Sequence, residues 1–133
     1  MKKHTFLLLV MLIINGFNGF SQNIITYQNV SVRVPNSAVT SQNFTNYEIF
    51  LNQAIDAFIN EDYDKAFYYL KNAEKDKVHG GAFWFYLGLT VHHRGDLNSS
   101  KRYLKKGYAD FGCWECGEVY EKLFKEKLKS PYP

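Results

Sequence analysis

The sequence predicts an all-α domain of about five helices, arranged as helix–turn–helix repeats and preceded by an extended N-terminal segment. Three observations lead to this class. Two stretches match each other 34 positions apart, a period typical of helical-hairpin repeats. Small residues recur at fixed places inside apolar, helix-like segments. An amphipathic segment follows the second stretch, and repeat arrays need such a segment to cover their open end.

Residues 1–21 are predicted to be a secretory signal peptide. Two lysines near the start precede an unbroken apolar run at 6–14, and a short region of mostly small and polar residues follows at 15–21. The apolar run is shorter than the roughly 20 residues that a membrane span requires. We therefore expect cleavage before Gln22 and a secreted or periplasmic chain. The alternative is an uncleaved N-terminal anchor.

The charge of the remaining chain gives no general attraction to nucleic acid. Of the 16 basic residues, two lie in residues 1–21, whereas all 13 acidic residues lie after them. The formal charge therefore falls from +3 to +1 on cleavage. A nearly neutral domain lacks the electrostatic pull that polyanion binding uses. We expect no nucleic-acid partner, and no membrane contact after cleavage.

Residues 22–46 are predicted to be an extended segment and a linker. Val30–Val34 alternates like a strand and stops at Pro35, and a run rich in Ser, Asn and Thr follows. A lone strand is unstable in water, so it must dock on another element or be disordered. We expect residues 24–34 to lie against the helical domain and partly fill its binding surface, which hydrogen exchange at Val30–Val34 would test.

The helical-repeat domain is predicted to span residues 47–129. Thr45 and Glu48 have the spacing of a capping box, which favours a helix start between them. Apolar residues recur at helical spacing through the last segment, which ends before Pro131. The expected helices cover 47–59, 64–75, 82–93, 98–109 and 114–129.

Two glycines inside the second stretch have different predicted roles. Gly88 corresponds to Ala54 in the 34-residue register, so we expect it where two helices cross and only a small side chain fits. Gly95 begins the Gly-Asp pair that corresponds to Glu61-Asp62. We expect it in the turn between helices, where glycine adopts a left-handed conformation at little cost.

The pattern resembles the tetratricopeptide repeat, whose consensus opens with W-x2-L-G-x2-Y. Trp84, Leu87 and Gly88 match this opening, and Val91 stands at the tyrosine position. The resemblance covers about residues 47–114 in two copies. The Sel-like repeat is a close alternative, but its repeats are usually slightly longer than 34 residues. The small, large and small positions of the second helix are occupied by Ser100, Leu104 and Gly107.

The resemblance implies a function in binding. In tetratricopeptide proteins the first helix of each repeat lines a concave groove that takes extended peptides. The alternative is that these residues only pack together, because two repeats hardly curve enough to open a groove. The residues of this chain at groove positions are Leu51, Ile55, Phe58, Ile59, Phe85, Leu89 and His92.

Cys113 and Cys116 form a C-x-x-C motif at the start of the last helix. Such a pair at a helix N-terminus can be redox-active, but the redox motif normally follows a strand in a βαβ unit. We therefore expect a short structural disulfide, as exported proteins often have. A zinc site lacks a second ligand pair at useful spacing. His92 and His93 point about 100° apart on a helix, which disfavours a shared metal ion.

These observations predict an exported, non-catalytic helical-repeat module that binds a protein or peptide. We expect no catalytic residues, no cofactor and no metal. The alternative function is thiol–disulfide exchange at Cys113 and Cys116. A third possibility is an accessory subunit whose groove is permanently filled.

Export generates the first testable prediction. Mass spectrometry of the chain purified from its native source should show an N-terminus near Gln22, because a signal peptidase removes the preceding residues. A full-length chain in the cytoplasmic fraction would contradict it.

Overall fold

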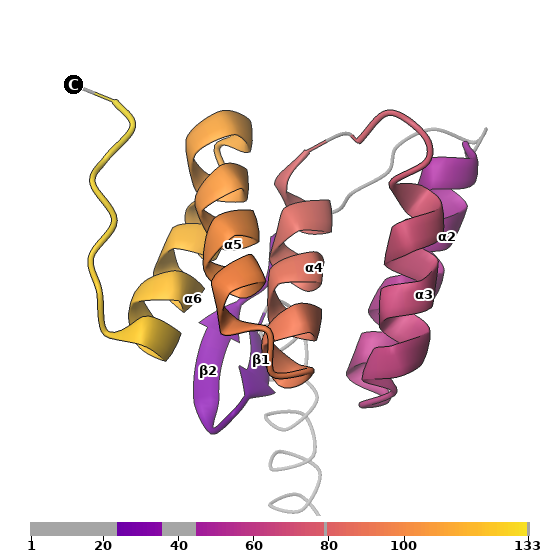
Figure 1. The fold of residues 1–133 in the computed structure, drawn as a ribbon, viewed down its shortest axis with the longest axis horizontal. Coiled ribbons are helices and arrows are strands. Elements are labelled where there is room, and N and C mark those ends of the chain that lie inside the picture. The colour runs from indigo at the N-terminus through magenta and orange to yellow at the C-terminus, as the bar shows by residue number, and fades with distance from the viewer. Residues whose placement is uncertain (1–23, 36–44, 79, 133) are drawn as a thin grey trace, which may run out of the picture. The chain divides into compact units, whose positions relative to one another are not determined.

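A computed structural model of the chain describes residues 24–35, 45–78 and 80–132. These described residues divide into two compact units, with the boundary after Val34. The predicted signal peptide and most of the predicted linker lie outside the described residues. Within the described part, the second unit contains five helices, labelled α2 to α6 (Figure 1). The all-α class is therefore confirmed.

The described residues of the first unit form an antiparallel hairpin, not the lone strand that the sequence predicted. Strand β1 covers Ile24–Tyr27 and strand β2 covers Val30–Arg33, with Tyr27 opposite Val30. Gln28 and Asn29 between them both have left-handed φ angles, 52° and 62°. That pair of angles suits a tight two-residue turn. Val30–Val34 thus has its pairing partner immediately before it in the chain.

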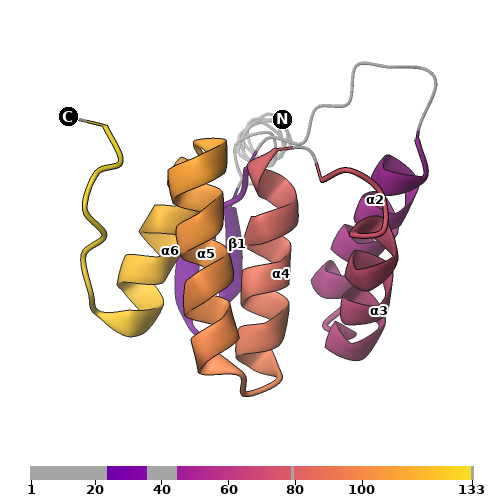
Figure 2. The same ribbon diagram turned by 45° about the horizontal axis from the view of Figure 1, so that its top comes forward.

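Two helical hairpins and a closing helix make up the second unit. The hairpins are α2 (Asn46–Ile59) with α3 (Tyr63–Ala73), and α4 (Gly81–His93) with α5 (Leu97–Phe111). Helix α6 (Trp114–Phe124) packs mainly on α5. Figure 2 shows α4 between the first hairpin and the α5–α6 pair. The capping box at α2 is confirmed, since Thr45 Oγ1 accepts from Glu48 N–H, and Glu48 Oε2 accepts from Thr45 N–H at 2.8 Å.

The 34-residue period is present in the backbone hydrogen bonds. At the first turn Asp62 N–H donates to the Ala57 carbonyl at 2.9 Å, and 34 positions later Asp96 N–H donates to the Val91 carbonyl at 3.0 Å. The Asp62 and Asp96 side chains both cap the following helix, by accepting from Lys65 N–H and Ser99 N–H. The two hairpins therefore turn in the same way, residue for residue.

Gly88 and Gly95 occupy the places that the sequence predicted. A Cβ atom at position 88 would lie 2.6 Å from Leu104 Cγ, so the α4–α5 crossing leaves no room for a side chain there. Ser100 Oγ donates to the Gly88 carbonyl at 2.8 Å across the same buried crossing. Gly95 has a left-handed φ of 88° and open space around it.

Helix α6 ends at Phe124 rather than near Lys129, which corrects the predicted boundary. Lys125 adopts a left-handed conformation with φ 58° and stops the helix. Glu126 then turns back and accepts from Tyr120 Oη at 2.7 Å and from Lys101 Nζ at 2.8 Å. These two hydrogen bonds lower the pKa of the Glu126 carboxyl. Apolar periodicity alone does not reveal this tertiary contact.

The α4–α5 crossing gives a prediction about stability. Gly88→Ala should lower the free energy of unfolding by about 1–3 kcal/mol, because the new methyl overpacks against Leu104. Leu104→Ala alone should cost about 2–5 kcal/mol through the cavity that it leaves. In the double variant the methyl enters that cavity, so the combined cost in urea unfolding should fall below the sum by more than about 0.5 kcal/mol. Strict additivity would place Gly88 away from this crossing.

Candidate functional site

The predicted groove residues fall into two groups in the structure. Leu51 and Phe58 of α2 are buried, and Phe85 and Leu89 of α4 have no exposed surface. Ile55 and His92 are half-buried, whereas Ile59 is 61% exposed. In this structure the accessible part of the predicted strip therefore lies toward the C-terminal ends of the first helices.

The burial of α4 explains why so little of the strip is accessible. All ten residues from Ala82 to Val91 are buried, so the helix has no solvent-facing side over that length. Aromatic contacts join it to its neighbours: Tyr47 and Phe58 of α2 pack on Phe83 and Tyr86 of α4. Helix α4 is the central element of the helical unit and contributes mainly to its core.

The two adjacent histidines point to different neighbours. His92 lies edge-on to Phe124 of α6, with ring centroids 5.5 Å apart. His93 stacks on Tyr63 of α3, with centroids 3.7 Å apart. Burial, and secondarily the adjacent His93, lower the pKa of the His92 ring and favour its neutral form. These contacts draw the rings apart, and the described residues contain no cluster of three or more His, Cys, Asp or Glu suited to a metal ion.

Cys113 and Cys116 form the predicted disulfide. Cys113 is the N-cap of α6, where its Sγ accepts from Cys116 N–H at 3.1 Å. The bridge fits closely against two glycines. A Cβ at Gly81 would collide with Cys113 Cβ, and one at Gly107 would lie 2.8 Å from Cys116 Sγ. The disulfide thus lies where the starts of α4 and α6 meet α5.

The surroundings of the disulfide favour a structural role over thiol–disulfide exchange. Exchange requires an attacking thiolate to reach one of the sulfur atoms. Here Cys113 is 4% exposed and Cys116 has no exposed surface. An incoming thiol therefore has no direct approach while the domain stays folded.

One cavity lies outside every residue set that the sequence analysis selected. It lies beside α6 and is lined in part by Trp114, Glu118 and Glu121, which share one helical face at spacings of four and three. That spacing is visible in the sequence and could have identified the face. Leu128 also lines the cavity, and its part in the lining could not have been found from the sequence. It belongs to the segment after the unexpected end of α6. Across the described ranges, no helix combines the length and the apolar character that crossing a membrane requires.

The disulfide gives a prediction about both stability and activity. Changing both Cys113 and Cys116 to Ala should lower the free energy of unfolding by about 2 kcal/mol, the loop-closure value for so short a loop. The purified wild-type chain should not catalyse insulin reduction by dithiothreitol, because its sulfur atoms are covered. Catalysis that Cys113→Ser abolishes would contradict the structural role.

Comparison of the chain with models of known protein families, with curated proteins and with solved structures gives no significant match.

Proposed function

We propose that the chain is an exported helical-repeat module that binds a protein or peptide and carries no catalysis of its own. The supporting observation is that the residues that repeat along the chain have structural roles. Positions with the 34-residue period provide helix crossings, helix caps and turns, such as Gly88, Asp96 and Gly95. The repeated pattern thus builds a scaffold and leaves specificity to the variable residues on its surface, as in repeat proteins generally.

The proposed family is the tetratricopeptide repeat. Two equivalent helical hairpins followed by a covering helix agree with that proposal. The partner would contact the first helices where they remain accessible, at Ile55 and Ile59 of α2 and near His92 of α4. Ile59 is a large apolar side chain exposed to solvent, and apolar anchors of this kind contribute strongly when a partner buries them.

Export is part of the same proposal. The Cys113–Cys116 disulfide supports it, because disulfides persist in oxidising compartments and are rare in the cytosol. The alternative function, thiol–disulfide exchange, uses the same pair of cysteines. Their burial makes it the weaker candidate.

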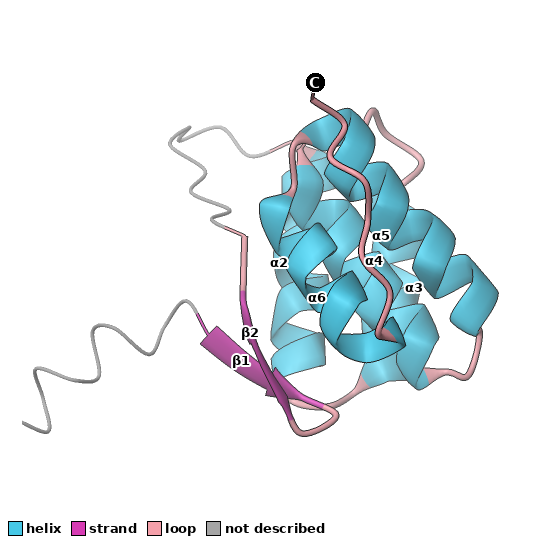
Figure 3. Ribbon diagram, turned by 90° about the vertical axis from the view of Figure 1, so that its left-hand side faces the viewer, coloured by secondary structure: helices cyan, strands magenta, loops and turns pink. Residues whose placement is uncertain are grey.

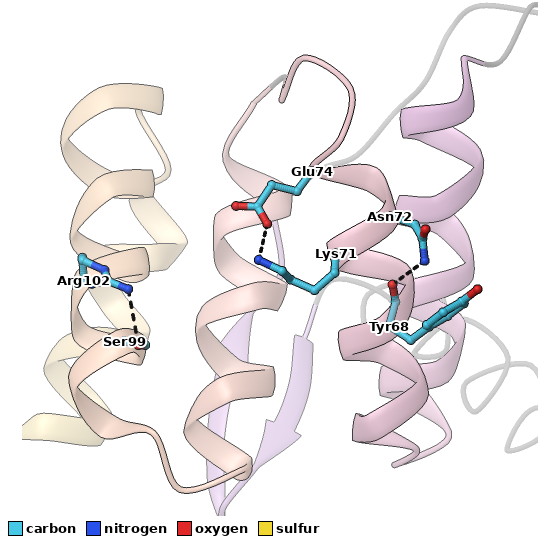
Figure 4. Close-up of polar contacts among 6 residues, drawn as sticks. All are labelled: Tyr68, Lys71, Asn72, Glu74, Ser99 and Arg102. Carbon is cyan, nitrogen blue, oxygen red and sulfur yellow. Dashed lines mark hydrogen bonds and ion pairs between the residues drawn. The ribbon is translucent and has the colours of Figure 1, made fainter.

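The second-helix surface provides a matched control for binding. Several of its polar contacts lie within one helix, such as the bond from Asn72 Nδ2 to the Tyr68 carbonyl and the bond from Arg102 to Ser99 Oγ (Figure 4). Tyr68 is 63% exposed, close to the value for Ile59. Tyr68→Asp and Ile59→Asp therefore place the same charge at equally accessible positions on opposite members of one hairpin.

A pull-down tests the proposal. The tagged chain, incubated with the extracytoplasmic fraction of its source, should retain one or a few specific proteins. Ile59→Asp should reduce that retention by about tenfold, since a charge replaces an apolar side chain that the partner would bury. Tyr68→Asp should leave retention unchanged. Equal retention by the wild type and both variants would place the binding surface elsewhere. If the wild type retains no specific protein, the proposed binding function is wrong.

A further inference from the structure

A cavity of about 300 Å³ lies between α5, α6 and the C-terminal segment. After α6 the chain reverses at Lys125 and runs back along the helix, so that the Tyr132 hydroxyl lies near Gly112 (Figure 3). Leu128 of this returning segment forms one wall. The volume is at the lower end of the range for ligand pockets, about 300–1,000 Å³. The cavity thus suits one side chain better than a larger ligand.

Two aromatic rings form a corner of the cavity. Tyr108 of α5 and Trp114 of α6 have ring centroids 6.2 Å apart and planes inclined at 51°. Gly117 makes this arrangement possible, because a Cβ there would lie 2.7 Å from a carbon of the Tyr108 ring. Trp114 is 66% exposed, although its indole is the largest apolar side chain on α6. The Trp114 indole is therefore exposed to solvent beside the Tyr108 ring, which packs where Gly117 has no side chain.

The charged residues that line the cavity are both carboxylates, Glu118 and Glu121. Glu118 forms an ion pair with Lys122 at 3.0 Å. Within the described ranges, Glu121 has no ion pair or side-chain hydrogen bond. Lys125 and Lys127 lie with the two glutamates around a neighbouring open depression, but neither pairs with them in the described part of the chain. The cavity thus combines aromatic faces with one carboxylate, that of Glu121, that has no ion pair within the described ranges, although lysines lie around the neighbouring depression.

We propose that this cavity binds the guanidinium group of an arginine side chain from a protein partner, an inference that rests on the proposed binding function. A planar cation stacks on indole and phenol faces and also pairs with carboxylates. An anionic guest in the cavity would meet the carboxylate of Glu121, which has no ion pair within the described ranges. A neutral apolar guest would remove water from that charge without compensation. Lysine fits the charge but lacks the flat surface that two inclined rings favour.

Peptide titration followed by NMR tests the proposal. The probe is an acetylated and amidated pentapeptide with a central arginine, added to the purified chain with its disulfide intact. The indole N–H signal of Trp114, assigned with Trp114→Phe, should shift and saturate. The same peptide with citrulline, a neutral group of nearly equal shape, should cause no saturable shift. Equal shifts with both peptides, or none with arginine, would overturn the proposal.

Two single-charge variants locate the binding. Glu121→Gln should lower the affinity for the arginine peptide by about two- to fivefold, the range for an accessible ion pair. Glu115→Gln removes the same charge from the same helix but outside the cavity lining, and should leave affinity unchanged. Equal weakening by both would indicate general attraction to α6 and refute a site. Binding of free arginine amide without binding of the peptide would indicate a small-molecule site instead, which also refutes it.

The experiments separate this inference from the proposed function. If the pull-down partner depends on Ile59 and the arginine peptide does not bind, the binding function stands and the arginine site fails. If the arginine peptide binds as expected and the pull-down retains nothing specific, the arginine site beside α6 is supported. The proposed partner interaction at the first helices then fails.

Discussion

The close approach of α4 and α5 at Gly88 is the constraint on which the rest of the helical unit depends. Leu104 fills the space above Gly88 with no room for another carbon, and Ser100 bonds to the Gly88 carbonyl inside the same crossing. Neither contact tolerates a shift of one helix along the other. Because α4 touches α2, α3, α5 and α6, its position against α5 also sets the places of the other three helices.

The disulfide extends this constraint to the covering helix. Gly107 lies one helical turn beyond Leu104 on α5, and it leaves room for both Cys116 Sγ and Trp84 Cβ. Gly81 leaves room for Cys113 at the start of α4. The small residues of the repeat thus have two uses, since they allow one helix crossing and then accommodate the bridge that caps α6. This dual use explains how a chain with so few helices holds its last one in place.

Local sequence signals predicted most of the fold because most of it is local. The capping box at Thr45, the Asp caps and Gly95 all act within a few residues of their own helix ends. The missed end of α6 comes from a conformation that the residue type does not indicate. Lys125 adopts a left-handed φ of 58°, although it is neither a glycine nor an asparagine. The next residue, Glu126, accepts from Lys101 Nζ of α5, a contact between residues far apart in the sequence.

The candidate site was harder to predict for a related reason. Register identifies which residues face inward along the first helices, but not whether that face stays open. Phe85 and Leu89 belong to a helix whose consecutive residues are buried, so in this structure they contribute to the core. An exposed aromatic residue, Trp114, and two glutamates lie instead on α6, where the chain turns back on itself. In so short an array the central helix is needed for packing, and the end helix, which has a neighbouring helix on fewer sides, has more surface available for recognition.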